Sequence, residues 1–171
     1  MEYGFHGTPT SKIAQAAGVA NGTLFHYFKT KDDLIIALYL DIKSRMGQCV
    51  EGWPTNGDSL KSALRNFFLS NLQWALDNQL EFKFIQQFSS SPFQSLVPVD
   101  QSSEQMVQFF SMIHSGIKEE ILKPVKPELI FILGSSNLFG VFQYLTTTDL
   151  SEESKNEVIS QTFEMFWDMI T

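Results

Sequence analysis

The stretch that decides the fold is residues 8–31, TPTSKIAQAAGVANGTLFHYFKTK. Thr8 before Pro9 is typical of a helix start, because the threonine hydroxyl can cap free amides and proline at the first helical position loses no useful donor. Gly18 is typical of a helix end. A second short helix is predicted over residues 21–27. Two short helices joined by a tight turn that contains glycine have the geometry of a helix-turn-helix.

Small and branched apolar residues recur through this stretch and suit two helices that pack at a steep angle. They are Ile13, Ala14, Ala17, Val19, Leu24 and Phe28. Packing alone leaves two interpretations open, a DNA-binding unit and a glycine-turned corner of an ordinary helical bundle.

The charge of the chain is unevenly distributed around the predicted helix-turn-helix. The 171 residues hold 12 Lys plus Arg against 19 Asp plus Glu, a net charge of −7, which argues against a generic nucleic-acid coat protein. Residues 1–48 nevertheless carry +1 and the remaining 123 residues carry −8. From His6 to Lys31 there are three lysines and no acidic residue. The acidic average therefore hides an acid-free patch over the predicted motif.

The rest of the chain shows helical periodicity and no sustained strand alternation, so we expect an all-α protein. Thr30 predicts a capped start for a helix that ends near Cys49, and residues 52–58 predict a loop at a domain boundary. Further helices are predicted over residues 60–75, 80–88, 106–117, 128–145 and 151–170, with an irregular segment over 89–100. The helix over residues 128–145 is apolar on nearly all sides, so we expect it to be buried on nearly all sides.

Read continuously, residues 4–34 resemble the DNA-binding domain of the TetR family of bacterial transcriptional regulators. The resemblance rests on short motifs in the family's order and spacing: Gly4-Phe5, Thr8, Ile13-Ala14, Ala17-Gly18-Val19, Gly22-Thr23-Leu24-Phe25, Tyr27-Phe28, Lys31 and Leu34. Only Met1 to Tyr3 stand before the Gly-Phe pair, where the family has a first helix, so that helix is expected to be truncated. The resemblance implies a DNA-binding domain over residues 1–48 and an effector-binding and dimerisation domain over residues 49–171.

The resemblance also assigns DNA-binding roles to individual residues. Thr8 is expected to cap its helix and offer its hydroxyl to a phosphate. The residues expected to grip the DNA backbone are Thr23, Tyr27 and Lys31, and those expected to reach base edges are Asn21, Phe25 and His26. Gly22 is expected to let the protein backbone approach the DNA closely. Ala20 replaces the serine or threonine that often caps the recognition helix, a loss of about 1 kcal/mol unless Asn21 takes over.

The second domain is expected to hold a small, largely apolar effector and to form a homodimer. Polar groups on apolar helical faces need partners when buried, which makes Asn71, His114 and Asn137 pocket candidates, although each also suits a satisfied core or interface position. The phenylalanines expected in the pocket are Phe84, Phe88 and Phe110, and together with Phe139 they suggest the largely apolar effector. The predicted helices over residues 128–145 and 151–170 are expected to pair with their copies as a four-helix bundle.

The sequence shows no recognisable catalytic motif. The sequence has three histidines that lie far apart and one cysteine, and it contains no metal-binding, phosphate-binding or nucleophile motif. We therefore expect neither an enzyme nor a cofactor or metal site. The single Cys49 excludes an internal disulfide, and no signal peptide or bilayer-spanning apolar stretch is apparent, so we expect a cytoplasmic protein without a membrane partner. The prediction is a repressor released from operator DNA by its effector. The alternative is a helical ligand-binding or interaction protein that does not bind DNA.

Overall fold

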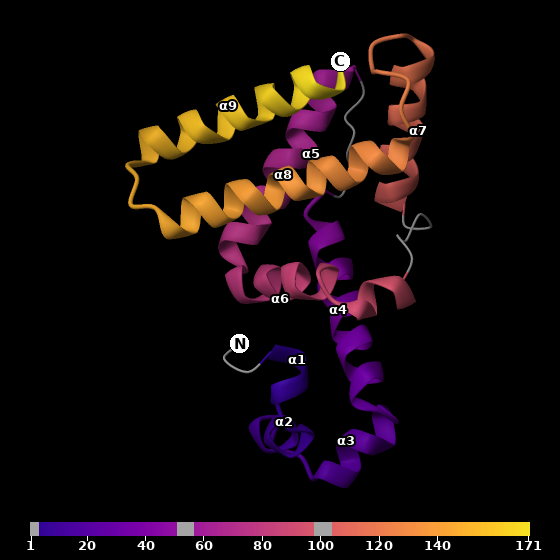
Figure 1. The fold of residues 1–171 in the computed structure, drawn as a ribbon, viewed down its shortest axis with the longest axis vertical. Helices are drawn as coiled ribbons and strands as arrows, with labels where there is room; N and C mark the ends of the chain where they lie inside the picture. Colours follow the sequence, from indigo (N-terminus) through magenta and orange to yellow (C-terminus); the bar gives the residue numbers. More distant parts are fainter. Residues whose placement is uncertain (1–3, 51–56, 98–103) are drawn as a thin grey trace.

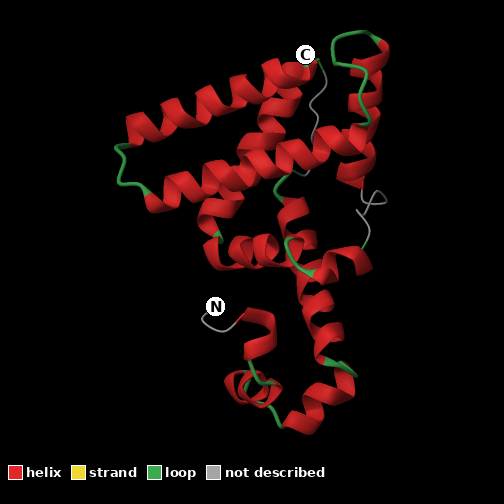
Figure 2. Cartoon of the chain, viewed as in Figure 1, coloured by secondary structure: helices red, strands yellow, loops and turns green. Residues whose placement is uncertain are grey.

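A computed structural model describes residues 4–50, 57–97 and 104–171, and over these residues it contains helices and no strand, which confirms the all-α prediction (Figures 1 and 2). The elements in chain order are α1 (Gly4–Gly7), α2 (Thr10–Ala16), α3 (Asn21–Tyr27), α4 (Lys31–Gln48), α5 (Leu60–Asp77), α6 (Gln79–Ser89), the 3₁₀ helix η1 (Pro92–Leu96), α7 (Glu104–Lys118), α8 (Pro127–Thr147) and α9 (Glu152–Ile170). Helices α1 to α3 form one end of the molecule, and α4 runs from that end into a bundle that includes α5, α8 and α9 (Figure 1).

The turn between α2 and α3 is built as predicted. Gly18 adopts a φ of 68°, and its N–H donates to Gln15 O while the Val19 N–H donates to Ala14 O. This pair of bonds is a Schellman motif, which needs a left-handed residue and therefore favours glycine. Ala14 of α2 and Leu24 of α3 are buried where the two helices pack.

The start of α2 differs from the prediction. Pro9 is the N-cap residue, with an extended ψ of 141°, and its side chain makes no capping hydrogen bond. Thr8 therefore lies outside the helix and is not its cap, because the extended conformation of Pro9 delays the first helical residue to Thr10. Ala20 likewise offers no side-chain cap bond to α3.

Helix α4 begins as predicted. The Asp33 N–H donates to Thr30 Oγ1 at 3.0 Å and the Thr30 N–H donates to Asp33 Oδ2 at 2.9 Å, which completes a capping box. The predicted loop over residues 52–58 lies mostly outside the described residues, which resume at Gly57. The predicted irregular segment over 89–100 contains η1 up to Leu96, with proline in its first turn.

Phenylalanine fills much of the bundle core. The rings of Phe82 and Phe142 lie 4.6 Å apart, and those of Phe68 and Phe163 lie 5.9 Å apart. These pairs join α6 to α8 and α5 to α9, so aromatic contacts between distant parts of the sequence hold the bundle together.

Helix α8 is buried on one side only, so the prediction that it is buried on nearly all sides is wrong for the single chain. Ile130 and Val141 are buried, whereas Leu129, Ile132 and Tyr144 are exposed. By length and composition alone α8 is also apolar enough to cross a membrane, but here it packs against α5 and α9. Residues 129–148 carry no charge, so the exposed side of α8 is an uncharged surface.

Candidate DNA-binding surface and ligand sites

Helix α3 presents its predicted contact residues outward. Leu24 is the buried residue that anchors the helix. The exposed residues are Asn21, Gly22, Thr23, Phe25, His26 and Tyr27. The Tyr27 side chain is 75% exposed and its ring meets the edge of the His26 ring, with centroids 5.5 Å apart. The structure thus brings six of the eight predicted DNA contacts onto one short, open helix.

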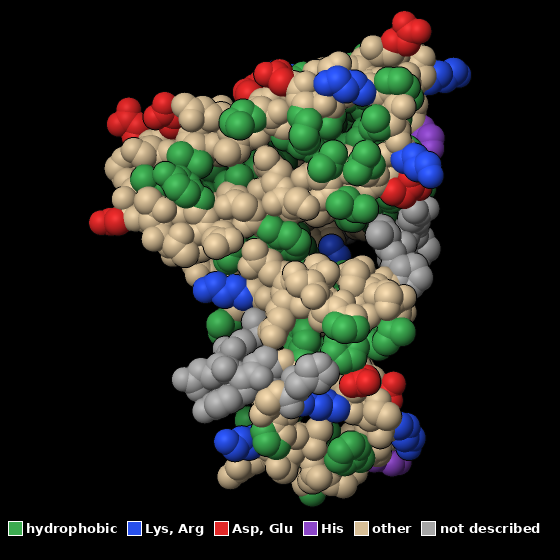
Figure 3. Space-filling view, viewed as in Figure 1, with side chains coloured by type: hydrophobic (Ala, Val, Ile, Leu, Met, Phe, Trp, Pro, Cys, Tyr) green, Lys and Arg blue, Asp and Glu red, His purple; other side chains and the backbone are tan. Residues whose placement is uncertain are grey.

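The remaining two predicted contacts flank α3 along the chain. Thr8 stands before α2 and Lys31 opens α4, and both are half-buried. The space-filling view shows basic and histidine side chains on the end of the molecule that α2 and α3 form (Figure 3). Because the chain has no acidic residue from Tyr3 to Lys31, this surface carries little to repel a phosphate backbone.

Gly22 faces open space. No atom lies within 4 Å of the position that a Cβ would take at this residue. The glycine is therefore not required by packing inside the chain, and its small size matters only to something that approaches α3 from outside.

Phe84 and Phe88, two of the predicted pocket residues, lie in an aromatic joint between the helix-turn-helix and the bundle. The Phe88 ring stacks on Tyr39 of α4, with centroids 3.8 Å apart, and the Phe84 ring meets Phe5 of α1 at 5.1 Å. Phe93 of η1 completes the cluster at 5.8 Å from Phe5. The two phenylalanines thus connect α1 and α4 to α6 and η1.

The other four predicted pocket residues are dispersed. Asn71 is buried on α5 and donates through Nδ2 to Phe67 O at 2.7 Å. His114 is exposed on α7, with Nδ1 2.7 Å from Phe110 O. Phe110 is buried on the same helix. Asn137 of α8 has a buried Oδ1 that no hydrogen bond satisfies in the described structure.

A groove of about 580 Å³ runs along α5 and is lined by none of these six residues. Its lining comes from α5, from the start of α9 and from the residue that follows α4: Cys49, Leu69, Ser70, Leu72, Gln73, Trp74, Leu76, Asp77, Asn156 and Ile159. Burial raises the pKa of the Cys49 thiol, so this cysteine is a poor nucleophile at neutral pH. Helical spacing alone gives no sign of this groove, because its walls come from segments far apart in sequence.

Lys43 is a functional candidate that sequence reasoning missed. It lies half-buried on α4, and burial lowers the pKa of its ammonium group. Its helical neighbours Tyr39, Met46 and Val50 all pack against the main core. The spacing of a lysine among these three apolar residues was the signal that could have identified it.

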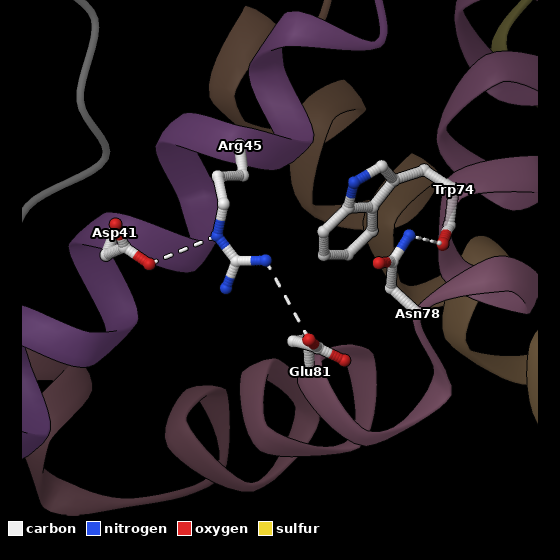
Figure 4. Close-up of polar contacts among 5 residues, drawn as sticks. All are labelled: Asp41, Arg45, Trp74, Asn78 and Glu81. Atoms are coloured by element: carbon white, nitrogen blue, oxygen red, sulfur yellow. Dashed lines mark hydrogen bonds and ion pairs between the residues drawn. The ribbon is translucent and has the colours of Figure 1, made fainter.

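A polar contact joins α4 to α6 beside this position (Figure 4). Arg45 Nε lies 3.1 Å from Asp41 Oδ2, and Arg45 Nη1 lies 3.8 Å from Glu81 Oε1 on α6. At the nearby corner between α5 and α6, Asn78 Nδ2 donates to Trp74 O at 2.9 Å. Both ion pairs are partly exposed, so they add about 1 kcal/mol or less to stability, and of the two the Arg45–Glu81 pair is the one that joins α4 to α6.

Metal ligands do not gather in the described part of the chain. No group of three or more His, Cys, Asp or Glu side chains there is arranged to hold an ion. The arrangement shows instead a helix-turn-helix on a helical bundle, which is the architecture of a DNA-binding regulator.

Comparisons with known proteins agree with this architecture. A family model described as "Bacterial regulatory proteins, tetR family" matches residues 1–38. The chain is 28% identical over 171 residues to the "Fatty acid metabolism regulator protein" of Bacillus subtilis (strain 168), covering 93% of this chain and 81% of that protein.

Two crystal structures of TetR family transcription regulators resemble the whole chain. One, from Shewanella sp. PV-4, is 30% identical with a TM-score of 0.84, covering 98% of this chain and 89% of that one. The other, from Marinobacter aquaeolei VT8, is 21% identical with a TM-score of 0.76, covering 95% and 84%, and shows a shared fold.

The chain belongs to the TetR family of bacterial transcriptional regulators. It is a DNA-binding regulator of transcription, with operator DNA and a second copy of the chain as partners. The resemblance drawn from residues 4–34 is thereby confirmed.

Proposed function

We propose that this protein is a repressor that leaves its operator when a small, largely apolar effector binds to residues 49–171. The observation that carries the proposal is the open face of α3, whose polar and aromatic side chains are exposed although the bundle nearby is closely packed. In a buried corner of a bundle these side chains would be covered.

Helix α3 is the proposed recognition helix in the major groove. Asn21, Phe25 and His26 would meet base edges, whereas Tyr27 and Thr23 would hold phosphates. Asparagine can bond adenine and Phe25 can touch a thymine methyl. Thr8 and Lys31 would add phosphate contacts at the two sides of α3. Substitutions at base contacts should therefore change site preference, and those at phosphate contacts should weaken all sites alike.

The proposed dimer forms through α8 and α9. Leu129, Ile132 and Tyr144 of α8 and Met165 and Met169 of α9 are exposed. Met165 is 69% exposed, and a group of exposed apolar side chains on two helices that pack together is typical of an interaction surface. A second copy would cover these exposed apolar side chains and place two α3 helices near the roughly 34–36 Å that separates successive major grooves.

The proposed coupling between effector and DNA runs through α4. This helix follows directly from α3 and reaches the bundle, where it contacts α6 through the Arg45–Glu81 pair and the Tyr39–Phe88 stack. An effector that prefers one position of α4 changes the spacing of the two α3 helices by its differential affinity for the two states.

The relative named for fatty acid metabolism supports an apolar effector for this chain. We therefore propose that the regulated genes belong to the metabolism of such molecules, and that the protein acts in the cytoplasm, where operator DNA is found.

The alternative, a helical ligand-binding or interaction protein without DNA binding, is separated by one experiment. Binding to the DNA upstream of the protein's own gene is measured at several salt concentrations for the wild-type chain and for Tyr27→Ala. We expect salt-dependent binding that Tyr27→Ala weakens strongly. The control is Leu80→Ala, since Leu80 is 71% exposed but lies on α6. Absence of salt-dependent binding by the wild-type chain would favour the alternative, and equal binding by all three proteins would contradict the role of Tyr27.

A further inference from the structure

Lys43 carries a charge that the described structure leaves unpaired. No hydrogen bond or ion pair of Lys43 occurs within residues 4–50, 57–97 and 104–171, although the side chain is half-buried. Cys49 is close enough to act electrostatically on Lys43, but burial raises the pKa of the Cys49 thiol, so the thiol does not neutralise the lysine at neutral pH. The acidic residue nearest along α4, Asp41, is bound to Arg45 on another side of the helix. Burying a cation without a partner costs free energy, so its retention calls for a function.

The side of α4 that bears Lys43 faces the first turn of α7. Gly47 lies one helical turn after Lys43, and a Cβ placed at Gly47 would come 4.0 Å from Oε1 of Gln105. Residues four apart share a helix face, so Lys43 and Gly47 point to the same side. The lysine is thus directed toward the space between α4 and the layer of α7 and α8.

The helices that border that space carry paired aromatic side chains. Figure 3 shows a hollow between the α7–α8 layer and α6, with a basic side chain at its floor. Phe139 of α8 lies 5.1 Å from Phe82 of α6, and Phe131 of α8 lies 5.6 Å from Phe109 of α7. Phe131 and Phe139 are only half-buried, so part of each ring is uncovered. Ser135 lies between them on the same face of α8.

We propose that Lys43 binds the anionic group of the effector, and that the effector is an apolar molecule that ends in a single carboxylate. The aromatic side chains of α8 would contact the apolar part, and the ammonium group would receive the carboxylate. This inference rests on the proposed function, because it names the chemical class of the effector. A purely structural lysine, with its stem buried and its head reaching water, is the competing explanation.

The position of Lys43 also connects ligand charge to DNA. The residue lies on α4, the same rigid helix that follows α3. A carboxylate bound to Lys43 therefore acts on the helix that orients the recognition helix, with no intermediate element. An apolar molecule without the acid group would fill the hollow but would lack this contact with α4.

The test compares two probes, decanoate and decanol, by calorimetric titration of the full chain without DNA. The variants are Lys43→Met and Lys43→Gln, with Lys83→Met as the control because Lys83 is an exposed lysine of α6. We expect wild type and Lys83→Met to bind decanoate about tenfold or more tightly than decanol, since a hydrogen bond to a charged group is worth about that factor. Both Lys43 variants should bind the two probes equally.

The titration uses no DNA, so its result is independent of the DNA-binding experiment that tests the proposed function. Decanoate affinity within twofold of wild type in both Lys43 variants would overturn the inference, as would a wild-type chain that binds neither probe. Thermal unfolding checks that the variants are folded. The Tm of Lys43→Met should rise, because the substitution removes a half-buried charge that has no ion-pair partner among the described residues. A purely structural lysine, whose head reaches water, would give no such rise in Tm and would leave decanoate binding unchanged.

Discussion

The exposed apolar side chains of α8 and α9 lead to a quantitative prediction for Ile132→Asp. Ile132 is 54% exposed in the single chain, so a second copy has about half of the side chain left to cover. Complete burial of an isoleucine is worth about 1.5–3 kcal/mol, which gives about 1 kcal/mol for this half. A two-fold interface uses each substitution twice, so the lost burial amounts to about 2 kcal/mol per dimer.

The aspartate adds a second cost. Two carboxylates would lose water in an interface that offers no cation along residues 129–148, and each such loss costs about 1 kcal/mol or more even with partial relaxation. The total of about 4 kcal/mol corresponds to a roughly thousandfold rise in the dimer dissociation constant.

Equilibrium sedimentation at micromolar concentration measures this constant, and far-ultraviolet circular dichroism confirms that the variant is folded. Leu80→Asp is the matched control, because Leu80 is exposed on α6, away from the proposed interface. A change of less than tenfold in Ile132→Asp, or an equal change in Leu80→Asp, would refute the reasoning. So would a wild-type chain that is monomeric under these conditions.

Further predictions concern DNA binding, helix ends, the aromatic joint and pH. Gly22→Ala should leave thermal stability equal or higher, because the Cβ meets no atom, yet weaken operator binding in a gel-shift assay; unchanged DNA affinity would contradict a close approach at α3. Glu120 holds a left-handed φ of 59° after α7, so Glu120→Gly should raise the free energy of unfolding in urea by about 0.5–1 kcal/mol, and a loss would contradict the assigned strain. Phe88→Ala should lower that free energy by about 3–5 kcal/mol, since Phe88 is fully buried and stacked on Tyr39, and a cost below about 1 kcal/mol would argue against the joint. Burial lowers the pKa of Lys43, so above that lowered pKa the unfolded chain keeps a proton that the folded chain loses, and stability rises with pH. The stability advantage of Lys43→Met over wild type, measured in urea, should therefore shrink between about pH 7 and about pH 10, whereas a constant advantage would contradict the lowered pKa.

Much of the helix-turn-helix was predictable because its signals are local. The bounds of α3, the glycine of the turn and the Thr30 cap of α4 all depend on residues within five positions of each other. The start of α2 was not predicted correctly, because the ψ angle of Pro9 determines whether the first helical residue is Pro9 or Thr10. The DNA-contact assignments remain predictions, although six of the eight residues lie on the exposed α3.

The proposed ligand site was less accessible to sequence reasoning. Phe84, Phe88 and Phe110 were predicted together, yet two lie in the joint with α1 and α4 and the third lies in α7. Periodicity identifies the apolar face of a helix but not which helix covers it, and contacts such as Phe5–Phe84 join residues far apart in sequence.

By itself, then, the sequence determined the all-α class, the helix-turn-helix and the acid-free surface around it, because caps, turns and charge counts are properties of neighbouring residues. The tertiary structure alone decided that α8 is covered on one side and open on the other, and that Lys43 is half-buried with no ion-pair partner among the described residues. Both facts depend on which distant segments fill the space beside a helix, and that is settled only when the whole chain packs.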